Sequence, residues 1–261
     1  ITGGGITRTV TVTQSGASGG SGGGTSLNWT AVNNCTNPGS NFAYRCNNTF
    51  KVGSTDYRFI GTNMPNIIRL SGSESIRTDA IYIQLKEAAR MGARVVRVWI
   101  SNDQWDANLI RDRLNEVFSI AEALETELNL TAGKDKFRFI LSLVNYQNES
   151  GNIVSGDNDC YEGSSERIMR PIWLSNGNVC TISGNCNQSP CSGGYRTRYI
   201  QNHLIPLANS FGSNWRVFAW ELGNEIRVTT DEEEEQLLKF LYHAGHELKN
   251  RVSQMITPGF M

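Results

Sequence analysis

Hydrophobic and polar positions follow two alternating periods along residues 57–257. Short apolar runs predict strands at 57–63, 94–100, 137–144, 215–222 and 252–257. Between them, apolar residues recur every three to four positions, which predicts helices at 79–91, 108–128, 196–211 and 231–250. Strands that alternate with helices form right-handed βαβ units around a parallel sheet. The pattern therefore predicts an α/β fold.

Phosphate-binding loops do not follow any of these strands. The glycine-rich tract at 16–24 lacks the Lys-Ser/Thr ending of a P-loop and precedes no helix. A nucleotide-binding fold is thus disfavoured, and repeated βα units favour a barrel of the (β/α)8 TIM type. Five such units fit the sequence, so we expect a barrel that is truncated after its fifth strand.

Composition divides the chain into three expected regions. Residues 1–26 form a Gly/Ser/Thr-rich arm that contains a short β-strand pattern and a linker-like tract. Residues 27–56 form an Asn-rich N-terminal segment that Cys35 and Cys46 are expected to close. Residues 57–261 hold the partial barrel, with an irregular excursion at 145–194. Because a free loop of that length is uncommon, we expect disulfides to hold it.

The cysteines indicate an oxidising compartment. They form an even set within Asn/Gly/Ser-rich stretches, and no Cys-x-x-Cys pair suggests zinc, so three disulfides are favoured over a metal site or free thiols. The first residue is Ile1, which suggests a removed leader or a fragment. We therefore expect a secreted, extracellular protein. The six cysteines are Cys35, Cys46, Cys160, Cys180, Cys186 and Cys191.

Glycosylation sequons fit the same compartment, although a chain this rich in Asn, Ser and Thr yields about four by chance. They begin at Asn28, Asn34, Asn47, Asn129, Asn148 and Asn187. His243 and His246 lie three positions apart beside Glu247, a spacing that can grip a metal. No third ligand stands at a sensible position, so we expect no metal.

The charge balance bears on the partner. There are 24 Lys and Arg residues against 25 Asp and Glu, a net charge of -1, and no basic cluster. Nucleic acid is therefore disfavoured as a partner, and no apolar run is long enough to span a bilayer. A neutral or weakly charged ligand fits better.

Chemistry in a βα barrel lies at the carboxyl ends of the strands. Glu225 closes the run W-E-L-G-N-E after the fourth expected strand, where a glycosidase places its general acid. The alternative is a loop glutamate that pairs with Arg227. The other polar or aromatic candidates at strand ends are Asn63, Trp105, Asn145, Tyr146 and Asn224.

The run at 220–225 resembles the fourth-strand motif of the large glycoside hydrolase clan with (β/α)8 barrels. Family five enzymes, especially endo-β-1,4-mannanases, are most similar. F-I-G-T-N at 59–63, M-G-A-R-V-V-R-V-W at 91–99 and I-T-P-G-F at 256–260 match their first, second and fifth strands in order. The resemblance covers roughly residues 48–261. It implies a retaining glycosidase that needs no cofactor, with Glu225 as the acid/base.

The resemblance also implies roles for neighbouring residues. Asn224 would hold the sugar 2-hydroxyl, and Arg97 would orient the nucleophile, although Arg97 could equally be a structural charge inside the barrel. Trp99 or Trp105 would stack on sugar rings. The third-strand ending V-N-Y-Q-N differs from the Trp-bearing loop of mannanases, which leaves the substrate open.

The family's nucleophile Glu lies at the end of the seventh strand, which is not part of this sequence. Three functions therefore compete. The chain is part of a retaining β-glycanase whose remaining barrel supplies the nucleophile, or it is an inactive structural subunit that self-associates through an open barrel edge and the 1–26 arm. The third possible function is to bind polysaccharide without cleaving it.

Overall fold

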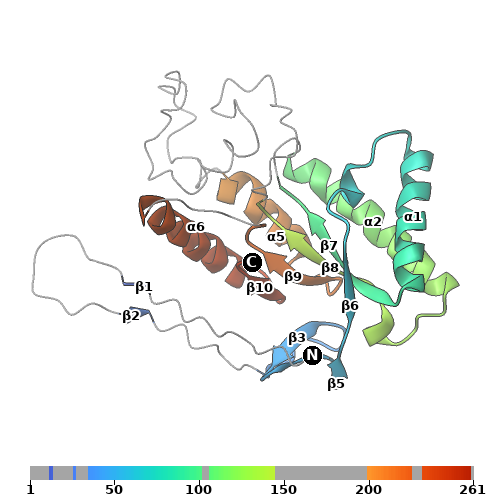
Figure 1. Ribbon diagram of the computed structural model, residues 1–261, viewed down its shortest axis with the longest axis horizontal. Helices are drawn as coiled ribbons and strands as arrows, with labels where there is room; N and C mark the ends of the chain where they lie inside the picture. The colour runs from blue at the N-terminus through green and yellow to red at the C-terminus, as the bar shows by residue number, and fades with distance from the viewer. Residues whose placement is uncertain are drawn as a thin grey trace, which may run out of the picture.

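A five-stranded sheet organises the computed structural model, which describes residues 12–13, 26–27, 35–101, 106–144, 199–224 and 231–259. The strands stand in the order β10-β9-β8-β7-β6, and every neighbouring pair is parallel (Figure 1). The expected alternation of strands and helices around a parallel sheet is thereby confirmed. The strands are β6 (Ile60–Asn63), β7 (Ala93–Trp99), β8 (Arg138–Ser142), β9 (Val217–Glu221) and β10 (Met255–Thr257).

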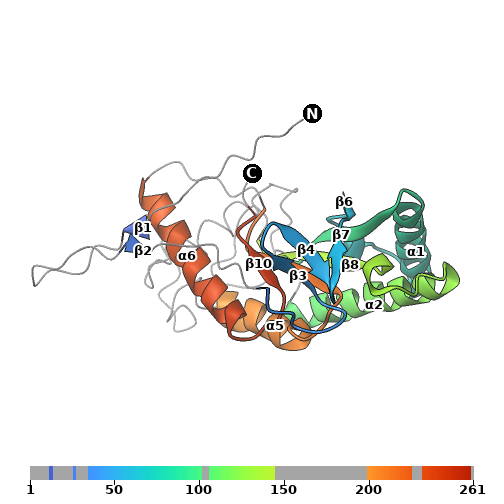
Figure 2. The same cartoon turned by 90° about the horizontal axis from the view of Figure 1, so that it is seen from below.

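The helices lie in an arc along one side of this sheet (Figure 2). They are α1 (Glu74–Arg90), α2 (Ala107–Glu127), α5 (Ile205–Phe211), which a π-helical turn η4 (Ile200–Leu204) precedes, and α6 (Asp231–Lys249). Short 3₁₀ turns occupy Ile67–Arg69 (η1) and Gly133–Asp135 (η2). No helix in the described ranges is both long and apolar enough to cross a membrane.

The main hydrophobic core fills the space between the sheet and the helices. Alternate strand residues such as Val96, Leu141 and Trp220 pack there with Leu114 of α2 and Phe240 of α6. All five side chains are fully buried. Burial of this apolar surface stabilises the stacking of helices on the sheet, and it leaves the other strand positions facing the opposite side.

A small antiparallel sheet covers part of that opposite side. It consists of β3 (Ala43–Cys46), β4 (Thr49–Val52) and β5 (Thr55–Tyr57), and lies across the large sheet from the helices (Figure 2). Ala43, Val52 and Tyr57 pack against Val95 and Phe218 of the large sheet. The inner face is therefore apolar toward the amino ends of its strands. A separate pair, β1 (Val12–Thr13) and β2 (Ser26–Leu27), is antiparallel.

The expected first strand at 57–63 was wrong in its extent. Tyr57 ends β5, which pairs antiparallel with β4, whereas the parallel strand β6 begins at Ile60. The tight turn at Gly53, where φ is 59°, reverses the chain after β4, and residues 55–57 then pair with β4. The Tyr57 ring then stacks on Phe59 with a centroid distance of 5.3 Å.

Two further element boundaries differ from the sequence expectation. α1 begins at Glu74 rather than at 79, because Ser73 caps the helix by accepting a hydrogen bond from the Ile76 amide. β10 begins at Met255 rather than at 252, because the Val252 amide still donates to Leu248 O at the end of α6. Gly92, with a φ of 79°, follows α1 in the left-handed conformation common after helices.

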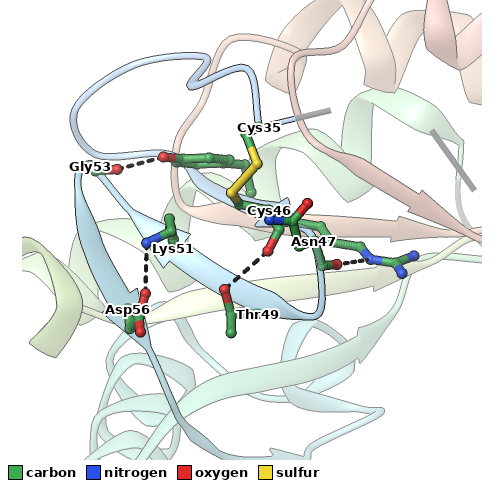
Figure 3. Close-up of a disulfide and its surroundings, with 9 residues drawn as sticks. Cys35, Cys46, Asn47, Thr49, Lys51, Gly53 and Asp56 are labelled. Carbon is green, nitrogen blue, oxygen red and sulfur yellow. Dashed lines mark hydrogen bonds and ion pairs between the residues drawn. A yellow bond between two sulfur atoms is a disulfide. The ribbon is translucent and has the colours of Figure 1, made fainter. Parts of the chain in front are cut away.

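A disulfide ties the small sheet to the segment before it. Cys35 and Cys46 are bonded, and the Thr49 hydroxyl donates to Cys46 O at 3.0 Å in the adjoining turn (Figure 3). Lys51 and Asp56 form an exposed ion pair across the neighbouring strands at 2.7 Å. The bond closes a separation of 11 residues in a segment that has few apolar side chains of its own.

Replacement of this disulfide by Cys35→Ser with Cys46→Ser should destabilise the protein. Closing a loop of this size restricts the unfolded chain and is worth about 2–3 kcal/mol of unfolding free energy. Urea unfolding of both forms measures the difference. Asp56→Asn in the same small sheet is the matched control and should change little, because exposed ion pairs contribute little. Equal midpoints for the double serine variant and the wild type would contradict the expectation.

Candidate functional site

The carboxyl ends of the parallel strands bring polar residues of the inner face together. Asn63 at the end of β6 is in register with Arg97 of β7. Two residues further along β7, Trp99 is in register with Ser142 of β8, which is in turn in register with Glu221 of β9. Polar groups from four neighbouring strands thus lie at one edge of the sheet, where active sites of βα barrels lie.

Arg97 is the centre of this group. Its Nε donates to Glu221 Oε2 at 2.6 Å, and its Nη2 donates to Glu221 Oε1 at 2.9 Å. The same Nη2 donates to Asn224 Oδ1 at 2.7 Å, and Nη1 makes a longer contact of 3.4 Å with Asn63 Oδ1. Three of the residues singled out from the sequence, Asn63, Arg97 and Asn224, therefore meet in one network.

Glu221 is the member that the sequence analysis missed. It is 7% exposed and is bound by Arg97 in a bidentate ion pair. A signal for it was present, because Glu221 is the charged residue of the apolar strand Val217–Glu221, just as Arg97 stands inside the apolar run of β7. Buried charges are expensive unless they are paired, so two such residues on neighbouring strands of one sheet are candidates for a mutual ion pair.

Asn224 is held by its backbone as well as by its side chain. It is 5% exposed, and its amide donates to Val144 O, just after β8, at 2.6 Å. Because the guanidinium donates to Oδ1, the oxygen of the side-chain amide faces Arg97 and Nδ2 lies on the other side of the amide group. Asn224 is thus fixed in orientation immediately before Glu225 in the chain.

Trp99 and Ser142 add two buried polar atoms to the same edge. Trp99 is 7% exposed and Ser142 is 1% exposed. Trp99 Nε1 and Ser142 Oγ make no hydrogen bond within the part of the chain that the structure describes. A part for Trp99 in stacking on sugars stays a prediction.

Several residues singled out from the sequence lie outside the described ranges. They include the acid/base candidate and three strand-end candidates, namely Glu225, Trp105, Asn145 and Tyr146. Four cysteines and four sequon asparagines are also outside: Cys160, Cys180, Cys186, Cys191, Asn28, Asn34, Asn148 and Asn187. The sequon residues Asn47 and Asn129 are described, and both are exposed. The stretches that the structure describes contain no cluster of three or more His, Cys, Asp or Glu arranged around a metal.

A second buried ion pair lies at the opposite, amino edge of the sheet. Glu125 of α2 accepts from Arg216 Nη1 at 2.7 Å and from Arg216 Nη2 at 3.0 Å. It also accepts from the Phe137 amide at 2.7 Å, and Arg216 stacks on Trp215. This ion pair joins the end of α2 to the starts of β8 and β9, so its role is structural.

Comparison with known proteins identifies the fold. No protein-family model and no curated protein matches the sequence. Among solved structures, the chain is similar to a glycoside hydrolase family 5 mannosidase from Rhizomucor miehei, with 12% identity and a TM-score of 0.52 over 85% of this chain and 56% of that one. It is also similar to a β-mannanase from the blue mussel Mytilus edulis, with 11% identity and a TM-score of 0.53 over 84% of this chain and 63% of that one.

The chain therefore spans less than two thirds of either structure. At these identities the likeness concerns the fold alone. The fold is of the (β/α)8 TIM-barrel type, and the described residues supply five of its strands.

Proposed function

We propose that this chain is part of a retaining endo-β-glycanase that hydrolyses β-1,4-linked polysaccharide, with a β-mannan as the first substrate to test. The observation that carries the proposal is the Arg97 network at the carboxyl edge of the sheet. It fixes Asn224, the residue before Glu225, at the end of the fourth strand of a barrel fold that glycoside hydrolases share. A neutral polysaccharide also suits a chain of net charge -1 without basic clusters.

Each residue receives a role in this mechanism. Glu225 protonates the glycosidic oxygen as the bond to the leaving sugar breaks, and then deprotonates the water that attacks the glycosyl intermediate. Asn224 donates to the sugar 2-hydroxyl, and Asn63 lies on the other side of Arg97 from it. Within the described residues, Arg97 Nη1 makes only the long contact to Asn63, so it is the part of the guanidinium best placed to meet a second carboxylate.

The second carboxylate is the nucleophile, and it must stand about 5–5.5 Å from the acid/base for retention. We propose that it comes from the remaining three βα units of the barrel, outside this sequence. Closure would then pair new strands with β6 and β10, the two edge strands of the described sheet. Activity would need both parts of the barrel.

The test is hydrolysis of linear β-1,4-mannan by the intact natural protein, measured as new reducing ends. Glu225→Gln should lower kcat by about 10²–10⁴-fold, because the general acid is lost while the shape is kept. Glu234→Gln on α6, at an exposed position, is the matched control and should retain the activity. Hydrolysis that Glu225→Gln leaves unchanged would refute the assignment of Glu225.

An assembling, inactive subunit is the second candidate, and the two edges of the sheet favour it, since no further strand pairs with them within the described residues. Ile60 on the edge strand β6 is 59% exposed, and unpaired strand edges invite pairing with other chains. Absence of hydrolysis together with regular polymers in electron microscopy would favour this candidate. Binding of mannan with neither hydrolysis nor polymers would instead indicate a polysaccharide-binding module.

A further inference from the structure

The buried carboxylate of Glu221 has no part in the chemistry proposed above. It lies at the last position of β9, beside the inner-face residues of β8 and β10. Both of its oxygens accept from Arg97, at 2.6 and 2.9 Å, so the planar guanidinium is held at two points. A bidentate pair fixes both the position and the plane of an arginine, which a single contact does not.

That fixed plane determines how Arg97 meets Asn224. Arg97 Nη2 serves both partners, with one bond to Glu221 Oε1 and one of 2.7 Å to Asn224 Oδ1. A neutral amide can bind in either of two orientations related by a flip, and only a strong donor beside it selects the oxygen. Arg97 is this donor, and Glu221 determines where it points.

We infer that Glu221 is a positioning residue, which acts through Arg97 to fix the donor end of Asn224 toward the sugar. The inference rests on the proposed function, because it takes Asn224 as the residue that holds the substrate hydroxyl. Glu221 itself touches no substrate in this arrangement. Its carboxylate also balances the charge of Arg97, so the site presents a neutral pair to a neutral ligand.

The fold keeps Glu221 in this conformation from the β10 side. Gly259 follows β10 with a φ of 77°, and a Cβ at this position would lie 2.5 Å from Glu221 Cγ and 2.6 Å from Oε1. The backbone therefore packs directly on the Glu221 side chain. Together with the register between Glu221 and Thr257, this close contact leaves the carboxylate little freedom to turn away from Arg97.

The chain offers a matched control for Glu221. Glu125 is also buried, is also bound by an arginine through both oxygens, and lies at the opposite edge of the sheet. In Glu221→Gln and in Glu125→Gln alike, an NH₂ group replaces one acceptor oxygen and faces an arginine donor. Both variants should therefore unfold at a lower urea concentration than the wild type, but only Glu221→Gln should affect Asn224.

The experiment compares the intact protein with its Glu221→Gln and Glu125→Gln variants by NMR of the Asn224 side-chain amide and by mannan hydrolysis. We expect Glu221→Gln to shift the Asn224 NH₂ signals and to speed their exchange with water, and Glu125→Gln to leave them in place. We expect kcat per folded molecule to fall about 10–100-fold in Glu221→Gln with little change in KM, because a misplaced donor weakens binding of the transition state most. Glu125→Gln should retain the wild-type kcat.

Unchanged Asn224 signals in Glu221→Gln would overturn the inference, as would an equal loss of kcat in both variants. If Glu221→Gln does not fold, Glu221→Asp takes its place, since it keeps the charge with a shorter reach and should give a smaller shift of the same signals. A wild-type protein that cleaves neither mannan nor any other β-1,4-linked polysaccharide would refute the proposed function alone. The NMR comparison would still decide whether Glu221 orients Asn224.

Discussion

Trp220→Ala is expected to lower the free energy of unfolding by about 4 kcal/mol or more, since truncation of a buried Trp costs about 3–5 kcal/mol. Trp220 is fully buried between the sheet and the helices. Its Nε1 also donates to Gln254 Oε1 at 3.1 Å, and the Gln254 amide in turn donates to Phe211 O and Asn214 O. The variant would lose apolar contacts and leave a buried acceptor without its donor, which adds about 1–3 kcal/mol.

Urea unfolding followed by circular dichroism measures this loss. Trp220→Phe is the matched control, because it keeps most of the apolar area and removes only the hydrogen bond to Gln254. We expect its loss to be less than half of that in Trp220→Ala. Equal stability of Trp220→Ala and the wild type would contradict the packing of Trp220 in the core.

Gly259→Ala is expected to have the second large effect. A Cβ at Gly259 would lie 1.9 Å from Gly223 O and 2.5 Å from Glu221 Cγ, and the residue has a φ of 77°. Alanine is therefore strained in its backbone and also collides with the site. Each source costs about 1–3 kcal/mol, so we expect a total loss of about 2–6 kcal/mol.

The control for this variant is the same substitution in α6. Among the described residues, a Cβ at Gly245 would meet only Leu222 Cδ1 at 3.9 Å, an ordinary contact. Because alanine has a higher helix propensity than glycine, Gly245→Ala should raise the free energy of unfolding by about 1 kcal/mol. Urea unfolding should therefore give a lower free energy of unfolding for Gly259→Ala and a higher one for Gly245→Ala, each relative to the wild type. A stable Gly259→Ala protein would contradict the close packing of the chain after β10 on Glu221.

The Glu221 and Gly259 variants should both affect the orientation of Asn224. Gly259 limits the freedom of Glu221, Glu221 holds Arg97, and Arg97 orients Asn224. Any Gly259→Ala protein that folds should thus show the same displacement of the Asn224 amide signals as Glu221→Gln. The backbone at Gly259, just after β10, therefore contributes to the site through its contact with Glu221.

The sequence by itself determined the alternation of strands and helices, because apolar side chains must recur with the period of the element that buries them. It also indicated Asn224 as a polar residue just after an apolar strand, where βα barrels place their chemistry, and the resemblance to family five glycosidases indicated Arg97. The local hydrophobic pattern could not separate β5 from β6, because both stretches have the residue pattern of a strand. Only the pairing of residues 55–57 with β4 decided where one sheet ends and the other begins.

The partnership of Glu221 with Arg97 was decided by the tertiary structure. The two residues are 124 positions apart, and their contact depends on the register of β7, β8 and β9 in one sheet. The Gly259 contact likewise depends on how β10 lies beside β9. Residue type and periodicity describe what each segment buries, but strand order and register determine which buried charges meet. That is why the sequence indicated the arginine and the structure supplied its carboxylate.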